Sequence, residues 1–309
     1  MAAHGIMFHH FHDDRHPPGQ GSLSAAQLIR LIERIGPENI TPAEEFLWRA
    51  SHHKLRPHDI CITFDDNLRC QYDVALPVLE HYGLTAFWFV YTSVLQGNIE
   101  PLEVYRHFRM TAFDSIDDFY RAFFDCVDAS DDAALVRMLL SQFNPRAYLA
   151  AFPFYSDMDR RFRFVRDEAL GPARYHRIMD QMLADADYDI KTAAADLWLD
   201  DRAVRELYGR GHVIGLHSHT HPTRLEHLSE DEQRNEYYEN FAYLHNLLDA
   251  QPTTMSHPCN SYTPATLEIL RELGITLGFR ANMVMQEHSP LETPREDHTN
   301  LARSMSMAA

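Results

Sequence analysis

Short apolar runs that stop at polar residues predict the strands of this chain. The three clearest runs are rich in β-branched or aromatic residues, as buried strands are. They cover Asp59–Asp66, Thr85–Thr92 and His212–His221. Weaker runs of the same kind predict strands over Gly5–Phe11, Thr253–Cys259 and Leu277–Met283.

Helix signals fall between these runs. Ser24 opens a capping box before a helix over Ala25–Ile35. Thr263 and Pro264 open another helix that runs to Leu273. Strands and helices therefore alternate at both ends of the chain, which predicts an α/β fold with a parallel sheet.

The middle of the chain follows a different pattern. Residues 96–210 carry little strand signal, whereas Ser115 caps a run in which Phe119 and Phe123 recur at helical spacing. We therefore expect one domain over 1–309 with a largely helical insertion over 96–210. The aromatic content of the insertion favours a face buried against the rest of the chain or in a homodimer.

Composition narrows the class of protein. The chain has 309 residues, of which 45% are hydrophobic, and its net charge is −17. These values exclude a disordered protein and make nucleic acid an improbable partner. No apolar run is long enough for a membrane span, and the start of the chain lacks a signal-peptide pattern, so we expect a cytoplasmic protein with no membrane partner.

Two of the clearest strands end in residues that bind metals. One ends in Asp65 and Asp66, which strand alternation points in different directions, so one carboxylate can bind a cation while the other stays free. The other ends in His217 and His221. A carboxylate and two imidazoles form an open three-ligand site for Zn²⁺ or a similar divalent ion. With 20 histidines in the chain, about one pair four residues apart arises by chance, so only the combination is informative.

These segments resemble the polysaccharide deacetylases of carbohydrate esterase family 4. The similarity covers TFDD and the residues after it, GHVIGLHSHTHP, and HPCNSYTPATLEILRELGITLGFRANM. It implies a distorted (β/α)7-type barrel and removal of acyl groups from N-acylated sugars with a divalent metal. It further implies Asp65 as general base and Asp66, His217 and His221 as metal ligands. Zinc is the first expectation, with Co, Ni, Mn and Fe left open.

The resemblance also implies a histidine acid on a late strand, and His298 is the best candidate for it. The family's third motif contains an arginine that supports the catalytic aspartate, but this chain has no arginine in Ser256–Asn260. Arg280 on the next strand is a possible replacement. The other residues expected at the substrate are His10, His257, Cys259 and Asn260.

The leading interpretation is a metal-dependent hydrolase that removes an acetyl or other N-acyl group from a small or nucleotide-linked amino sugar. A second interpretation is a hydrolase of another linear amide, of the formamido or ureide type. A third is a non-catalytic barrel that binds a sugar or a metal. Asp65 argues against the third, because metal binding alone does not require a free carboxylate beside the ligands.

Overall fold

A computed structural model of the chain describes residues 2–150, 155–284 and 289–304. The chain forms two compact units. The first consists of Met1–Glu100 and Ala195–Ala309, and the second of Pro101–Ala194. Among the described helices, none has the length and apolar character needed to cross a bilayer.

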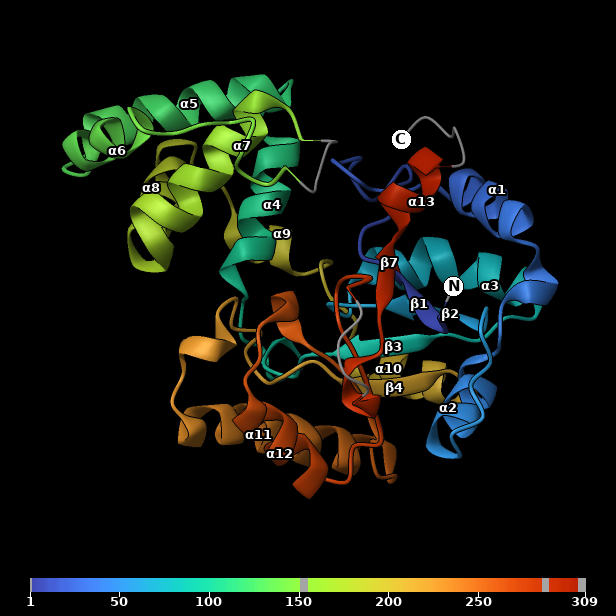
Figure 1. Cartoon of the computed structure of the whole chain (residues 1–309). Coiled ribbons are helices and arrows are strands. Elements are labelled where there is room, and N and C mark those ends of the chain that lie inside the picture. Colours follow the sequence, from blue (N-terminus) through green and yellow to red (C-terminus); the bar gives the residue numbers. More distant parts are fainter. Residues whose placement is uncertain (1, 151–154, 285–288, 305–309) are drawn as a thin grey trace. The chain divides into compact units, whose positions relative to one another are not determined.

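Seven parallel strands build the first unit (Figure 1). Their spatial order is β6-β5-β4-β3-β2-β1-β7. The strands are β1 (His4–Phe8), β2 (Ile60–Phe64), β3 (Phe87–Val90), β4 (Val213–Leu216), β5 (Thr254–Ser256), β6 (Leu277–Phe279) and β7 (Arg295–Asp297). The six strands predicted from apolar runs are all present, whereas β7 is short and polar and was not predicted.

The segment before β7 brings the sheet close to a full barrel. Thr293 pairs with Phe279 in parallel, and its N–H donates to the carbonyl of Gly278 at 2.9 Å. A Cβ atom on Gly278 would lie 2.5 Å from the carbonyl oxygen of Leu291, so this close approach requires glycine. The predicted distorted (β/α)7 barrel is confirmed.

Helices surround these strands and link them along the chain. Those of the barrel unit are α1 (Ala25–Ile35), α2 (Ala43–Ser51), α3 (Leu76–Tyr82), α10 (Asp201–Gly209), α11 (Glu230–Leu248), α12 (Pro264–Glu272) and α13 (His298–Ser304). The helix predicted over Ala25–Ile35 is confirmed with its capping box at Ser24. The helix predicted from Thr263 ends one residue earlier than expected.

Helix α2 closes the amino-terminal end of the barrel. Phe46 packs against Phe87 and Phe279, with both ring-centroid distances at 6.1 Å. The N–H of Ala43 donates to Oγ1 of Thr85, just before β3. Because this end is filled with aromatic side chains, the carboxyl ends of the strands are left for chemistry.

The second unit consists of helices in the part of the chain that the structure describes. Its helices are α4 (Pro101–Thr111), α5 (Ile116–Ala129), α6 (Ala133–Leu140), α7 (Asp157–Phe164), η4 (Val165–Leu170), α8 (Gly171–Asp185) and α9 (Ile190–Ala194). Helix α10, which the expected insertion over 96–210 included, belongs to the barrel unit.

Three phenylalanines of this unit are buried against one another. The Phe162 ring lies 5.4 Å from the Phe119 ring and 4.9 Å from the Phe123 ring, and all three side chains are almost fully buried. These three residues therefore need no partner subunit to be buried, whereas Phe152 and Phe154 lie outside the described residues. The homodimer stays a prediction.

Replacing Gly278 tests the barrel closure. We expect Gly278→Ala to lower the free energy of unfolding by about 1–3 kcal/mol, because the new methyl group collides with the backbone at Leu291. Gly209→Ala is the matched control, since a Cβ atom there meets nothing within 4 Å. Urea unfolding of both variants measures the difference, and equal stabilities would contradict this account of the closure.

Candidate active site

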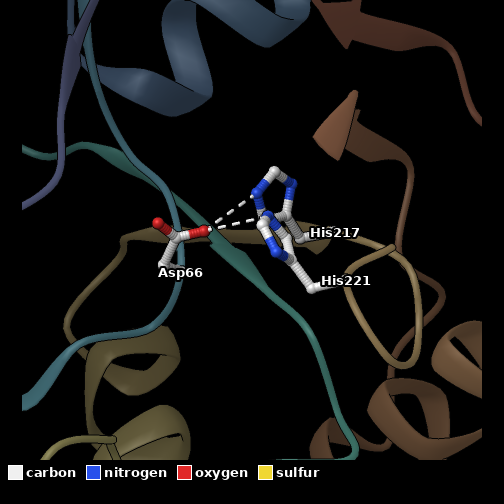
Figure 2. Close-up of side chains that lie close together, drawn as sticks. All are labelled: Asp66, His217 and His221. Atoms are coloured by element: carbon white, nitrogen blue, oxygen red, sulfur yellow. Dashed lines mark ion pairs between the residues drawn. The ribbon is translucent and has the colours of Figure 1, made fainter. Parts of the chain in front are cut away.

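The loops after β2 and β4 bring together three side chains of the types that bind metals (Figure 2). Oδ1 of Asp66 lies 3.2 Å from Nε2 of His217 and 3.3 Å from Nε2 of His221. One ligand atom from each residue falls within 4.8 Å of the others. The three residues singled out from the sequence therefore converge on one point at the carboxyl end of the barrel.

Left-handed backbone in both loops makes this convergence possible. Asp66 has φ 73 and Asn67 φ 41, while Ser218 has φ 60 and His221 φ 55. Such conformations are unfavourable for residues other than glycine and are held by their surroundings. Asn67 is buried, and its Oδ1 accepts a hydrogen bond from the N–H of Tyr91 at 3.3 Å. Asparagine tolerates left-handed backbone better than most other residues do.

Hydrogen bonding fixes the orientation of the His217 ring. Its Nδ1 lies 2.9 Å from the carbonyl oxygen of Ser256, so Nδ1 carries the proton and donates it. In the neutral ring, Nε2 then presents a lone pair to Asp66. Two lone-pair atoms at 3.2 Å require a cation or a proton between them.

The electrostatics of the three residues also fit a cation. Oδ1 of Asp66 is buried, and no described group donates a hydrogen bond to it with good geometry. Burial lowers the pKa of His221 to about 4, which keeps this ligand neutral near pH 7. Burial alone would also lower the pKa of His217, but the charges of Asp65 and Asp66 outweigh it and raise that pKa. The donor set of two nitrogens and one oxygen suits Zn²⁺ and its neighbours among the transition metals.

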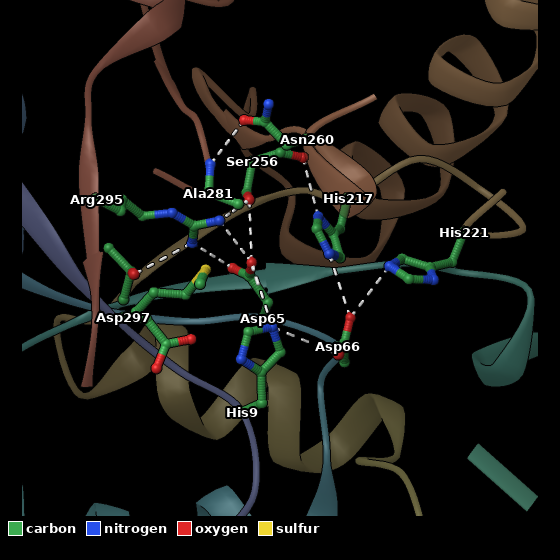
Figure 3. A network of polar contacts seen from close by, with 12 residues as sticks. His9, Asp65, Asp66, His217, His221, Ser256, Asn260, Ala281, Arg295 and Asp297 are labelled. Atoms are coloured by element: carbon green, nitrogen blue, oxygen red, sulfur yellow. Dashed lines mark hydrogen bonds and ion pairs between the residues drawn. The ribbon is translucent and has the colours of Figure 1, made fainter. Parts of the chain in front are cut away.

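Asp65 takes a different environment from Asp66 because Arg295 holds it (Figure 3). The guanidinium donates to both carboxylate oxygens, from Nη1 to Oδ1 at 2.6 Å and from Nη2 to Oδ2 at 2.7 Å. Burial would raise the pKa of Asp65, but Arg295 outweighs burial and lowers it. Asp65 is therefore an ionised carboxylate beside the three candidate ligands.

Arg295, and not Arg280, supports this aspartate. Further N–H groups of Arg295 donate to Oγ1 of Thr63, Oγ of Ser256 and the carbonyl of Arg280, so all five donors are used. Arg280 is buried, and its Nη2 donates to Oδ1 of Asn282. The expectation that Arg280 replaces the family's arginine is wrong, because the fully buried Arg295 side chain reaches Asp65 from β7.

His9 is the functional candidate that the sequence argument missed. Its Nε2 lies 3.9 Å from Oδ2 of Asp65 and 3.9 Å from Oδ2 of Asp66, and its side chain is 30% exposed. The alternation of side chains along β1 could have predicted His9. Gly5 of β1 faces the side chains of Thr63 and Arg295 inside the barrel, and His9 continues that side of the strand, whereas the expected His10 does not.

His298 lies apart from the site. Its Nδ1 is 3.1 Å from the carbonyl oxygen of Met7, and its Nε2 is 2.8 Å from that of Gly21. The ring also stacks on Phe8 at 5.2 Å. With both ring nitrogens against backbone carbonyls, the side chain ties α13 to β1, and it is not positioned to donate a proton beside Asp66.

The remaining expected substrate residues follow β1 and β5. The His257 ring is buried against Tyr262, and its Nε2 lies 2.9 Å from the carbonyl oxygen of Leu291. Burial lowers the pKa of His257 to about 3. Cys259 is exposed, and Oδ1 of Asn260 accepts a hydrogen bond from the N–H of Ala281. His10 is half-buried, and its ring stacks beside that of His9.

Comparison with known proteins identifies part of the chain. Residues 172–278 match the family model described as polysaccharide deacetylase. The match includes His217 and His221 but not Asp65 or Asp66. No curated protein sequence matches the chain.

Solved structures of low sequence identity share the fold. The Streptococcus pyogenes deacetylase PplD in complex with acetate has 16% identity and a TM-score of 0.58, over 99% of this chain and 98% of that one. IcaB from Ammonifex degensii has 13% identity and a TM-score of 0.56, over 99% and 95%. BC0361, a polysaccharide deacetylase from Bacillus cereus, has 11% identity and a TM-score of 0.53, over 99% and 69%.

The Arg295–Asp65 ion pair is testable by a double-mutant cycle in the presence of a chelator. We expect Arg295→Met to lower the free energy of unfolding by about 3–5 kcal/mol, because it leaves a buried carboxylate without its partner. Asp65→Asn should also destabilise the fold, and the double variant should lose less than the sum of the two. Additive losses in urea unfolding would show that the two side chains are not energetically coupled.

Proposed function

We propose that the chain is a metal-dependent hydrolase that removes an acetyl group from an N-acetylated amino sugar, and the match of residues 172–278 to the polysaccharide deacetylase family model supports this proposal. One observation carries the proposal. Adjacent carboxylates have separate partners, with Asp65 on Arg295 and Asp66 facing two histidines. A barrel that only binds a metal has no need of the first carboxylate.

Asp66, His217 and His221 would hold the metal. When bound, a divalent ion at this position polarises an amide carbonyl and makes a water molecule more acidic. Ser256 and Asn240 support His217 from behind, through its Nδ1 and its backbone N–H. These contacts fix the imidazole before the metal arrives.

Asp65 would accept the proton of the attacking water. Arg295 weakens the carboxylate as a base but keeps it ionised at neutral pH. Its Oδ2 accepts from Nη2 of Arg295 and from Oγ of Ser256 and lies on the side of His9. The fixed carboxylate therefore presents one oxygen toward the centre of the site.

His9 would give a proton to the leaving nitrogen. Its Nε2 stands at the same distance from both carboxylates, and its side chain is more exposed than those of Asp65 and Asp66. An amine leaves readily only when it is protonated, and a histidine beside the reacting atoms supplies that proton. This role replaces the one that we expected of His298.

Metal removal tests the metal dependence. We expect a chelator to abolish acetate release from N-acetylated amino sugars and to lower Tm, because a ligand of the folded state stabilises it. Added Zn²⁺ should restore both. The panel contains free, oligomeric and nucleotide-linked N-acetyl sugars together with N-formyl and ureide analogues. Full activity in chelator would refute the metal mechanism, and turnover of only the analogues would refute the proposed substrate class.

The adjacent aspartates should differ in their effects. Asp65→Asn is expected to retain the metal and lose most of the turnover, because only the base is lost. Asp66→Asn is expected to lose metal affinity, because a ligand is lost. Metal content by elemental analysis and kcat measured at saturating zinc separate the two. Equal metal contents with equal activities would contradict the assignment.

The proton donor is testable by comparing two histidines. We expect His9→Ala to bind metal and to lose about 10²–10⁴-fold in kcat, the range of general acid catalysis. His10→Ala is the adjacent control and should retain most of its activity. His298→Ala should lower Tm and leave kcat of the folded protein near that of the wild type. The reverse order, with His298→Ala inactive and His9→Ala active, would restore the assignment made from sequence.

A further inference from the structure

Two arginines of the helical unit have no acidic partner among the described residues. The side chains of Arg109 on α4 and Arg163 on α7 form no hydrogen bond and no ion pair with any described residue. Nε of Arg109 is buried without a partner. An unpaired charge in a partly buried position is unfavourable unless an ion or another group balances it.

A third arginine lies close to these two. The guanidinium of Arg109 lies 5.8 Å from the centre of the Phe119 ring and 6.0 Å from that of Phe162. The guanidinium of Arg166 lies 5.9 Å from the same Phe162 ring. Arg163 neighbours Phe162 in sequence and covers the Tyr155 ring at 4.0 Å. Guanidinium groups from α4, α7 and η4 thus gather around one aromatic cluster.

Two of the acidic groups nearby have other partners. Asp167 forms two hydrogen bonds with Arg166, at 2.6 Å and 2.9 Å. Asp159 accepts hydrogen bonds from the hydroxyl of Tyr120 and from the N–H of Ser156. Residues 151–154 read Ala-Phe-Pro-Phe and contain no acidic group.

The arginines also repel one another. Burial lowers the pKa of Arg163, and the positive charges of Arg166 and Arg109 lower it further. The chain has 45 acidic residues against 28 basic ones, so a shortage of acids does not explain why Arg109 and Arg163 have no acidic partner among the described residues. A bound anion would offset the cost of burying the Arg163 charge and the repulsion between the neighbouring guanidinium groups.

We propose that Arg109 and Arg163 bind a phosphate-type oxyanion in the helical unit, next to the ion pair of Arg166 with Asp167. The planar guanidinium presents paired N–H donors that match the oxygens of a phosphate group. This site is separate from Asp66, His217 and His221, and the proposal does not depend on the hydrolase reaction.

Titration of the full chain with inorganic phosphate tests the proposal. We expect a saturable rise in Tm and a saturable binding heat, neither of which sodium chloride reproduces at equal ionic strength. Arg109→Gln and Arg163→Gln should each weaken phosphate binding by about tenfold or more. Arg161→Gln is the matched control, because Arg161 is exposed on the same helix and lies over Phe124, and it should bind like the wild type. A phosphomonoester titrated in parallel distinguishes free phosphate from a phosphate group on a larger molecule.

Stability without phosphate distinguishes a binding role from a structural one. In phosphate-free buffer, Arg109→Gln and Arg163→Gln should have a Tm equal to or above that of the wild type, because each removes an unbalanced charge. If Arg163→Gln does not fold, Arg163→Lys keeps the charge without the planar fork and should fold and bind phosphate more weakly. No saturable response in the wild type, or an equal response in all three glutamine variants, would overturn the proposal.

Discussion

A buried ion pair between Arg295 and Asp65 organises the active-site end of the barrel. The guanidinium of Arg295 donates five hydrogen bonds. Two of them go to Asp65, and the others go to Thr63, Ser256 and the backbone of Arg280. One side chain therefore ties the last strand to β2, to β5 and to the residue after β6. A charge at this depth is tolerated only because every donor has a partner. The pair fixes Asp65 and leaves its neighbour free for a different task.

In the proposed mechanism the two adjacent aspartates have different tasks. Asp65 continues the inward side of β2, whereas Asp66 enters left-handed backbone with φ 73 and turns toward the histidines. The loop after β4 makes the complementary turn, with positive φ at Ser218 and His221. Backbone strain at both corners is the means by which a carboxylate and two imidazoles meet at one point. His9 lies beside both carboxylates, where the proposed mechanism places the proton donor.

Local sequence patterns predicted the parts of this site that depend on local structure. Two features of single strands were sufficient for this prediction: the alternation of side chains and the polar residues at which each apolar run stops. They placed Asp65 and Asp66 at the end of one strand, and His217 and His221 at the end of another. The arginine that pairs with Asp65 could not be predicted from local sequence. Arg295 lies on a three-residue polar strand without an apolar run, and only closure of the barrel brings this strand next to β1. Arg280 stood nearer in sequence to the family motif, but its own backbone carbonyl serves Arg295. Side chains alternate between the two sides of a strand, and Gly5 on β1 faces the barrel interior. Counting in twos from Gly5 gives His9, so strand alternation predicts His9 and not His10 on the inner side.

The crystal structure of the zinc-loaded protein, with anomalous data at the zinc edge, tests the central claim most directly. The account predicts one anomalous peak at about 2.0–2.2 Å from an oxygen of Asp66 and from Nε2 of His217 and His221, with Asp65 still bound to Arg295 and outside the coordination sphere. A zinc ion bound by Asp65, or a peak away from the two histidines, would contradict the division of roles between the adjacent carboxylates.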